Sequence, residues 1–501
     1  MAPVPVRRSA VHLHPDPRRV IVKSFLPGGR NPDDDRTRVE HILDRVLAME
    51  PADVARTLDE VRTRFDLRHD DLDAVLDVGL RAVAHLLADR PALDADIRAL
   101  VGAYFVHEYA IEAAALTNPS LVPAPDQTGV PDGSLRVIVS LRAIGEGHLS
   151  SIEFRGGTVD RDGEVTLDPP LAPVQGERRP PTFEGALFAA KLHEAGATDE
   201  PIPSILARLG EHFSMRELES ALAEFAADHR SPATQHAVQT IHWLAASNYE
   251  LAFPPASHVS QRVIFPASPA ESHGMEDARF VRFEDPDGAV THYATYTAYD
   301  GFNVLPQLVE TVDFATFRIA TLNGPAARNK GMALFPRQIG DRYVALGRAD
   351  NENTYVMYSD HVRFWHEAAR IQVPTRPWEL VQIGNCGPPI ETPEGWLVVT
   401  HGVGPMRTYS LGAILLALDD PRQVLGHLRD PLLVPDEHER DGYVPNVVYS
   451  CGSIVHADRL VLAYGASDSS TRFASVPLDV LLAELTSPAA SAPSTAAYTA
   501  R

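Results

Sequence analysis

The feature that most constrains this 501-residue chain is a long succession of short β-rich segments between Val263 and residue 485. Turns of Gly, Pro, Asp and Asn separate segments rich in Val, Ile, Tyr and Phe, which is typical of antiparallel strands. Several segments end in a polar cluster, such as YDG, GRAD, YSD, HGVG or GASD. Short, evenly spaced strands of this kind suit a sandwich, a barrel or a β-propeller. A propeller explains the polar clusters best, because its inner strands present their ends to a central channel.

Ahead of these strands, apolar residues recur at helical spacing from about Arg36 to Leu116. The pattern includes Leu43, Val46, Leu76 and Leu100 and predicts several amphipathic helices. The segment SLRVIVSLRA, residues 134–143, and the turn-rich stretch that follows it predict an early antiparallel β unit.

A second helical stretch is predicted between Phe183 and Tyr249. Ser214 and Glu217 have the spacing of a capping box, in which two side chains satisfy free backbone N–H groups at the start of a helix. Ser231 followed by Pro232 predicts another helix start.

The chain is longer than the roughly 250–300 residues at which one hydrophobic core stops growing, so more than one structural unit is expected. We expect a mainly β protein with helical additions at the N-terminus and as an insertion. The predicted divisions are an N-terminal α-helical region 1–116, a first blade region 117–182, a helical insertion 183–250, further blades 251–486 and a disordered tail 487–501.

The net charge of −22 disfavours nucleic acids and anionic membranes as partners. An anionic substrate would need basic residues gathered locally. Two cysteines, Cys386 and Cys451, exclude a disulfide framework and suit a reducing compartment. We find no signal-peptide pattern and no apolar run of membrane-spanning length, so a soluble, cytoplasmic protein is expected.

Standard catalytic motifs are absent from the sequence, which leaves polar residues at strand ends as the candidates for chemistry. Asp277, Lys330, His401 and Asp468 follow one another at intervals of roughly 50–70 residues, about one propeller blade plus a loop. Each alone has an ordinary explanation as a turn former, a solvated lysine or a buried histidine. Their spacing favours one shared axial site.

Carboxylates beside Arg, Lys, His and Tyr can bind an oxyanion and protonate a leaving group. Hydrolysis of a glycoside commonly uses two carboxylates, one as an acid and one as a base that activates water. An anionic nucleophile such as phosphate needs no base, only a cationic site and an acid.

The stretch from Glu276 to about residue 485 resembles glycoside hydrolase family 130, the β-mannoside phosphorylases and related β-mannosidases. The segments that carry the resemblance are MEDARF, YATYTAYDG, NKGMALFP, IGNCGPPIETPEGWLVVTHGV, YSLGAILLALDDP, DGYVPNVVYSCGSIV and LVLAYGASD, with NPSLV and SLRA earlier in the chain. The resemblance implies a five-bladed β-propeller with a central active site.

The resemblance also implies roles for individual residues. Asp277 is similar to the family's catalytic acid, which protonates the glycosidic oxygen through the 3-hydroxyl of the mannosyl unit while inorganic phosphate attacks with inversion. Positions associated with phosphate binding are Arg142, Lys330, His401 and Tyr409. Those assigned to the sugar substrate are Asn118, Glu276, Asp300, Arg348 and Asp468. The reaction needs no metal and no cofactor besides phosphate as co-substrate.

The sequence departs from the family pattern in two respects. Many members have an arginine near Gln307, for which Arg318 or Arg328 is a candidate substitute. The two helical segments lie outside the family core, and they are candidates for a cover over the channel mouth or a homo-oligomer interface. A β-mannosidase that uses water and a non-catalytic carbohydrate-binding propeller remain the alternatives to phosphorolysis.

Overall fold

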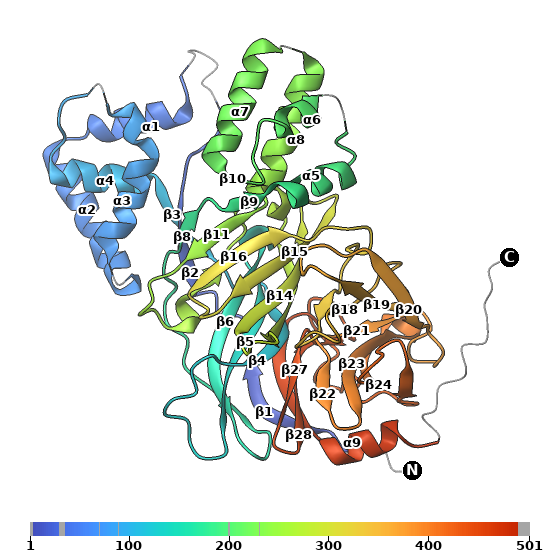
Figure 1. Cartoon of the computed structure of the whole chain (residues 1–501). Helices are drawn as coiled ribbons and strands as arrows, with labels where there is room; N and C mark the ends of the chain where they lie inside the picture. Colours follow the sequence, from blue (N-terminus) through green and yellow to red (C-terminus); the bar gives the residue numbers. More distant parts are fainter. Residues whose placement is uncertain are drawn as a thin grey trace. The chain divides into compact units, whose positions relative to one another are not determined.

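The computed structural model describes residues 4–29, 36–69, 71–88, 90–198, 201–229 and 231–488. The chain divides into two compact units, a smaller one of Pro17–Ile111 and a larger one of Met1–Asp16 with Glu112–Arg501. The larger unit is mainly β, as predicted (Figure 1). In the described ranges, none of the helices combines the length and apolarity needed to cross a membrane.

The smaller unit is a group of helices with one antiparallel strand pair. Its elements are α1 (Arg38–Leu47), α2 (Pro51–Phe65), α3 (Leu72–Val83), α4 (Ala95–Tyr104), β2 (Val20–Ser24) and β3 (Val106–Ala110). Helices α3 and α4 approach closely at Gly79 and Gly102, where a Cβ on either glycine would lie about 2 Å from backbone of the other helix. Leu43 and Leu100, both from the predicted apolar pattern, are fully buried in the core of this unit.

Five antiparallel sheets of four or more strands form most of the described part of the larger unit. The first contains β4 (Ala115–Pro123), β5 (Leu135–Ile144), β6 (Ser150–Val159), β7 (Val165–Leu167) and β12 (Val263–Ile264). The second contains β13 (Met275–Glu284), β14 (Val290–Tyr299), β15 (Val304–Thr311), β16 (Thr316–Thr321), β11 (Tyr249–Ala252) and β8 (Glu177–Arg179). The third contains β17 (Ala333–Leu334), β18 (Tyr343–Gly347), β19 (Thr354–Ser359) and β20 (Glu367–Gln372).

The fourth sheet contains β21 (Gln382–Asn385), β22 (Ile390–Thr392), β23 (Gly395–Val403), β24 (Tyr409–Leu416) and β25 (Val424–His427). The fifth contains β26 (Val448–Tyr449), β27 (Ser453–His456), β28 (Arg459–Ala466), β29 (Ser470–Pro477) and, from the other end of the chain, β1 (Arg7–Leu13). Strand β1 pairs antiparallel with β29 and joins the two ends of the described chain. Helix α9 (Leu478–Leu485) follows β29 and packs its leucines into the core of the last two sheets.

The predicted helical insertion is present in the larger unit (green in Figure 1). It contains α5 (Gly185–Glu194), α6 (Pro201–Leu206), α7 (Met215–Asp228) and α8 (Pro232–Ala246), with the short strands β9 (Thr182–Glu184) and β10 (His212–Ser214). Both predicted helix starts are confirmed, because Ser214 and Glu217 form a capping box on α7 and Ser231 caps α8.

The remaining helical pieces are single 3₁₀ turns. They are Asp66–Arg68, Ala84–Leu86, Glu146–His148, Val259–Gln261, Pro269–Glu271 and Pro405–Arg407.

The structure differs from the predicted divisions at the N-terminus. Residues up to Asp16 belong to the larger unit rather than to a helical region 1–116, because β1 completes the fifth sheet. The pairing partner of β1 lies more than 450 residues away, so no local pattern indicated this strand. Of the predicted disordered tail 487–501, residues 489–501 lie outside the described residues.

Candidate active site

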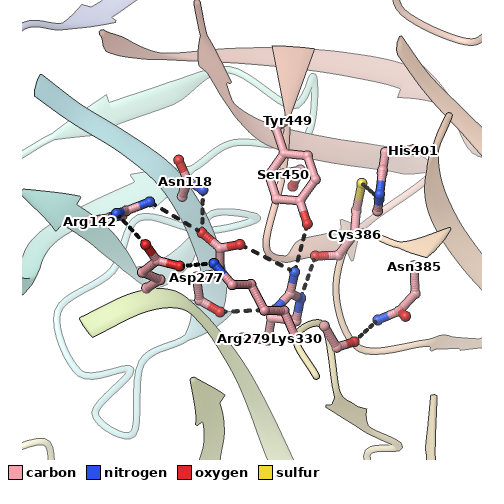
Figure 2. Close-up of polar contacts among 12 residues, drawn as sticks. Asn118, Arg142, Asp277, Arg279, Lys330, Asn385, Cys386, His401, Tyr449 and Ser450 are labelled. Carbon is pink, nitrogen blue, oxygen red and sulfur yellow. Dashed lines mark hydrogen bonds and ion pairs between the residues drawn. The ribbon is translucent and has the colours of Figure 1, made fainter. Parts of the chain in front are cut away.

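The proposed catalytic Asp277 lies at an irregularity of the second sheet. The pairing of β13 with β14 shifts register between Glu276 and Arg279, and Asp277 has a φ of +58°. Strand β4 has a matching shift around Asn118, whose φ is +48°. Such bulges turn a side chain away from the regular alternation of a strand and occur often beside active sites. Here they bring Asn118 Nδ2 to donate a hydrogen bond to Asp277 Oδ1 (Figure 2).

A buried guanidinium group lies beneath the Asp277 carboxylate. Arg279 is 1% exposed, and its Nη2 lies 3.8 Å from Asp277 Oδ2. The same Nη2 donates to the Tyr449 hydroxyl over 2.7 Å, while Nε donates to the Cys386 carbonyl over 3.3 Å (Figure 2). Arg279 is therefore held rigidly by groups from the fourth and fifth sheets.

Glu276 links two further cations to this carboxylate. Its Oε1 accepts a hydrogen bond from Arg142 Nη2 at 2.9 Å, and its Oε2 forms an ion pair with Lys330 Nζ. Arg142 Nη1 also lies 4.0 Å from Asp277 Oδ1. Arg142 comes from β5, Glu276 from β13 and Lys330 from the loop before β17, so three sheets contribute to one cluster.

His401 and Arg348 form a second, more deeply buried group. His401 on β23 is fully buried, and burial together with the charges of Arg348 and Arg279 holds the pKa of its ring well below 6.5, so the ring is neutral. Gly384 pairs directly with His401 across the sheet, and a Cβ there would lie 2.4 Å from Arg348 Cδ and 2.8 Å from His401 Cε1. Arg348 and His401 therefore pack together over this glycine.

Two nitrogen atoms of this group stand out within the part of the chain that the structure describes. Arg348 Nε and His401 Nε2 are buried there without a hydrogen-bond partner. Leaving a buried polar atom unpaired costs about 1–3 kcal/mol, so such atoms call for a partner such as a bound anion. Tyr409, half-buried at the start of β24, stacks its ring 6.1 Å from that of His401.

Asp468 lies near the first cluster, in the turn between β28 and β29. Burial, followed by the negative charge of Asp277, raises its pKa from 3.8 to about 6. Arg142 and Arg407 act in the opposite direction. A carboxyl group with this pKa is partly protonated near neutral pH and can then donate a hydrogen bond as well as accept one.

Asp300 differs from the other predicted residues. Its carboxylate accepts hydrogen bonds from the backbone N–H groups of Phe302 and Asn303, at 2.8 and 2.6 Å, and from Asn303 Nδ2. These bonds lower its pKa against the effect of its burial. Both oxygens are thus used to shape the loop after β14.

The predicted site residues Asn118, Arg142, Glu276, Asp277 and Lys330 are joined by direct contacts. Sequence reasoning gave no role to Arg279, although this arginine lies in the quoted segment MEDARF. It also missed Tyr449, although this tyrosine lies in the quoted segment DGYVPNVVYSCGSIV.

The two candidates for the arginine missing near Gln307 are placed differently. Arg318 lies in β16, paired with Glu250 and Glu310 across the sheet, and Arg328 is exposed. Gln307 itself is fully buried and donates from Nε2 to the Ser247 carbonyl over 3.1 Å.

Comparison with known proteins identifies the family. Residues 255–486 match the model of glycoside hydrolase family 130, described as beta-1,4-mannooligosaccharide phosphorylase. A 1,2-beta-oligomannan phosphorylase from Thermoanaerobacter sp. is 34% identical over 207 residues, covering 40% of this chain and 67% of that protein. The chain belongs to glycoside hydrolase family 130.

One further relative and one solved structure are similar to the chain. A beta-1,2-mannobiose phosphorylase from Listeria innocua is 31% identical over 230 residues, covering 44% of this chain and 63% of that protein. A solved structure of beta-1,2-mannobiose phosphorylase from Listeria innocua aligns with a TM-score of 0.44 and 20% identity, over 74% of this chain and 92% of that one. The sequence matches thus span about two thirds of the length of these relatives.

Proposed function

We propose that this protein is an inverting β-mannoside phosphorylase, which converts a small manno-oligosaccharide and phosphate reversibly into α-mannose 1-phosphate and a shortened sugar. The observation that carries the proposal is the pair of buried nitrogens without a hydrogen-bond partner in the described residues, Arg348 Nε and His401 Nε2. Arg279, whose charge acts on His401, lies 3.8 Å from the Asp277 carboxylate and so connects this pair with the proposed acid. The names of the relatives, which are mannoside phosphorylases, support the same reaction.

For the fold, we infer a five-bladed β-propeller in which each large sheet is one blade. Contacts between sheets support this arrangement. Strand β4 of the first sheet contacts β13 of the second, which contacts β17 of the third; β18 contacts β21, β24 contacts β26, and β28 of the fifth sheet contacts β4 again. A cycle of contacts between five consecutive antiparallel sheets is what a propeller requires.

In the proposed reaction, Asp277 supplies a proton, which passes through the 3-hydroxyl of the mannosyl unit to the glycosidic oxygen. The bond between C1 and that oxygen breaks, and a phosphate oxygen bonds to C1 from the opposite face. Asn118 orients Asp277 and, with Asp468, holds the mannosyl ring. The phosphate, already an anion, needs no base and no metal.

We assign the phosphate to Arg142, Lys330, His401 and Tyr409, and we add Arg348 because its free Nε lies beside His401. This differs from the sequence-based assignment of Arg348 to the sugar. Glu276 holds the Arg142 and Lys330 cations in place through its two oxygens. For Asp300 we propose a loop-shaping role, since its carboxylate is occupied by Phe302 and Asn303.

The test is incubation of the protein with β-1,2-mannobiose or β-1,4-mannobiose, with and without inorganic phosphate. We expect turnover only with phosphate, and α-mannose 1-phosphate as a product, identified by NMR. Lys330→Ala and His401→Ala should raise the KM for phosphate about tenfold to a hundredfold, because each removes a hydrogen bond to a charged group. Release of free mannose without phosphate would identify a β-mannosidase, and sugar binding without turnover a non-catalytic propeller.

We also propose that the protein is cytoplasmic, that it has no nucleic-acid or membrane partner, and that it forms a homo-oligomer through the helical segments.

A further inference from the structure

The helical insertion contacts the loop that leads to Lys330. Lys191 on α5 is 8% exposed, and its Nζ donates to the Leu322 carbonyl over 2.7 Å. Glu194, one turn further along α5, pairs with Lys191 Nζ at 3.2 Å through Oε2. Its Oε1 accepts a hydrogen bond from the backbone N–H of Gly324. One ion pair on α5 therefore binds both a carbonyl and an N–H group of this loop.

The end of α8 makes a second set of contacts with the same region. Asn248 Oδ1 accepts from the Thr321 N–H at 3.0 Å, and the Ser247 carbonyl accepts from Gln307 Nε2 at 3.1 Å. Gln307 occupies the position near which many family members have an arginine, so in this chain that side chain joins the second sheet to the insertion. The insertion is thus bonded to β15, to the end of β16 and to the following loop.

The loop between these contacts and Lys330 is held by further backbone and side-chain hydrogen bonds. Gly324 has a φ of +98° and lies against the Trp365 backbone, and the Ala327 N–H donates to the Gly324 carbonyl over 3.0 Å. Asn329, with a φ of +59°, donates from Nδ2 to the carbonyl of Ala349, the residue after Arg348. One hydrogen-bonded turn and the bond made by Asn329 therefore lie between Gly324 and the Lys330 backbone.

We propose that the Lys191–Glu194 pair on α5 positions Lys330 for phosphate, so that the helical insertion is part of the machinery that sets phosphate affinity. This inference rests on the proposed function. Lys191 and Glu194 act through the loop, and neither touches the phosphate. An insertion that served only for packing would change the stability of the protein without changing how it uses phosphate.

The experiment compares Glu194→Ala with Glu224→Ala, a control on α7 whose carboxylate lies 3.6 Å from Arg208 within the same insertion and is 72% exposed. We expect Glu194→Ala to raise the KM for phosphate about tenfold, the effect of losing about 1.4 kcal/mol of binding, with kcat and the KM for the mannoside within twofold of the parent. Glu224→Ala should leave all three unchanged. Glu194→Gln, which keeps an acceptor for the Gly324 N–H, should recover most of the loss.

Amide hydrogen exchange gives a readout that does not depend on turnover. In Glu194→Ala the peptide 322–330 should exchange at least tenfold faster, while the peptide around His401 should keep the parent rate. If Glu194→Ala does not fold, Lys191→Met carries the same comparison, because it removes the bonds of Lys191 to the Leu322 carbonyl and to Glu194 and leaves Glu194 to accept from the Gly324 N–H.

If Glu194→Ala leaves both the KM for phosphate and the exchange rate of peptide 322–330 unchanged, the inference is overturned. Phosphate-dependent turnover by the parent protein would still uphold the proposed function. A parent protein that turns over mannosides without phosphate would overturn both. Faster exchange in 322–330 with an unchanged phosphate KM would overturn the positioning role, since the loop would then move without consequence for Lys330.

Discussion

Asp277, Asn118 and Asp468 share a backbone conformation that side chains other than glycine rarely adopt. Their φ angles are +58°, +48° and +48°. Each such residue costs on the order of 1–3 kcal/mol, which the surrounding sheets must offset. Asn118 donates a hydrogen bond to Asp277, and Asp468 lies close enough to Asp277 for their charges to interact, so at these three positions the cost falls on neighbouring polar side chains.

Asp277→Asn tests the acid. Asparagine has the same shape and keeps an oxygen for Asn118 Nδ2, but it cannot donate a proton as a carboxylic acid does. We expect phosphate-dependent turnover to fall by about 10²–10⁴. The measurement is kcat at saturating phosphate and mannobiose. Asp360→Asn, whose side chain is 91% exposed, is the control, and a variant of Asp277 that kept a tenth of the parent rate would exclude it as the acid.

Asp468 predicts a pH dependence of stability. Its pKa is raised from 3.8 to about 6 in the folded protein, so folding favours the protonated form. The resulting stabilisation is complete below pH 4 and is lost as the pH rises through 6. Asparagine does not titrate, so Asp468→Asn should gain stability relative to the parent between pH 4 and pH 8, by about 3 kcal/mol at most.

Urea unfolding of the parent and Asp468→Asn at pH 4, 6 and 8 measures this difference. If the difference in the free energy of unfolding between the two proteins stays constant with pH, the pKa of Asp468 is not raised by folding, and the prediction is wrong.

At the scale of single elements, short strands and turns bring the cationic groups together. Strand β21 contributes Gly384, whose missing side chain leaves room for both Arg348 and His401. The loop after β18 holds Arg348 through a bond from Nη2 to the Asn351 carbonyl, 3.0 Å long. A glycine in a strand interior often marks such a close approach.

Gly384→Ala should therefore displace the Arg348 and His401 side chains, because its Cβ would lie 2.4 Å and 2.8 Å from them. We expect the KM for phosphate to rise about tenfold, an effect of about 1.4 kcal/mol. Gly28→Ala is the control, since nothing lies within 4 Å of a Cβ at that position. The measurement is steady-state kinetics with varied phosphate. An unchanged KM for phosphate would show that Arg348 and His401 do not bind it.

At the scale of the whole molecule, a protein of net charge −22 gathers Arg142, Arg279, Lys330 and Arg348 around one site. These residues come from three sheets, with Lys330 and Arg348 both from loops of the third, so the relative placement of the sheets decides whether the site exists. The fifth sheet depends on β1, which pairs with β29 and adds Arg8 to the buried Glu439.

Arg8→Met tests how much the Arg8–Glu439 ion pair of β1 contributes to stability. Arg8 Nε and Nη2 donate to the two oxygens of Glu439 at 3.2 and 3.0 Å, and Glu439 is 1% exposed. Without Arg8 the buried Glu439 carboxylate loses a cationic partner, which destabilises the folded protein. We expect the free energy of unfolding to fall by about 2 kcal/mol, less than for a fully buried pair because Arg8 is partly exposed. Arg7→Met is the matched control, because its ion pair with Glu164 is exposed and should contribute less than about 1 kcal/mol. Equal effects of the two variants would contradict the prediction.

Sequence patterns predicted those features that neighbouring residues decide. The caps at Ser214 and Ser231, the strand predicted at 134–143 and observed at Leu135–Ile144, and the buried faces of the N-terminal helices depend on interactions within a few residues. The cluster of Arg142, Lys330 and Asp277 was predicted because these residues belong to family motifs. The contacts of Arg279 and the partner of Gln307 were not predicted, since they come from segments that lie far away in the sequence.

By itself, the sequence determined the short strands, the helix starts and the set of chemical groups at the strand ends, because alternation, capping and turn formation are local. The tertiary structure alone decided that β1 pairs with β29, that α5 binds the loop before Lys330, and that burial keeps His401 neutral and raises the pKa of Asp468. The physical reason is that electrostatic and hydrogen-bond energies depend on the distance between atoms and on their exclusion from water. Both quantities are set when segments that lie far apart in the sequence pack together.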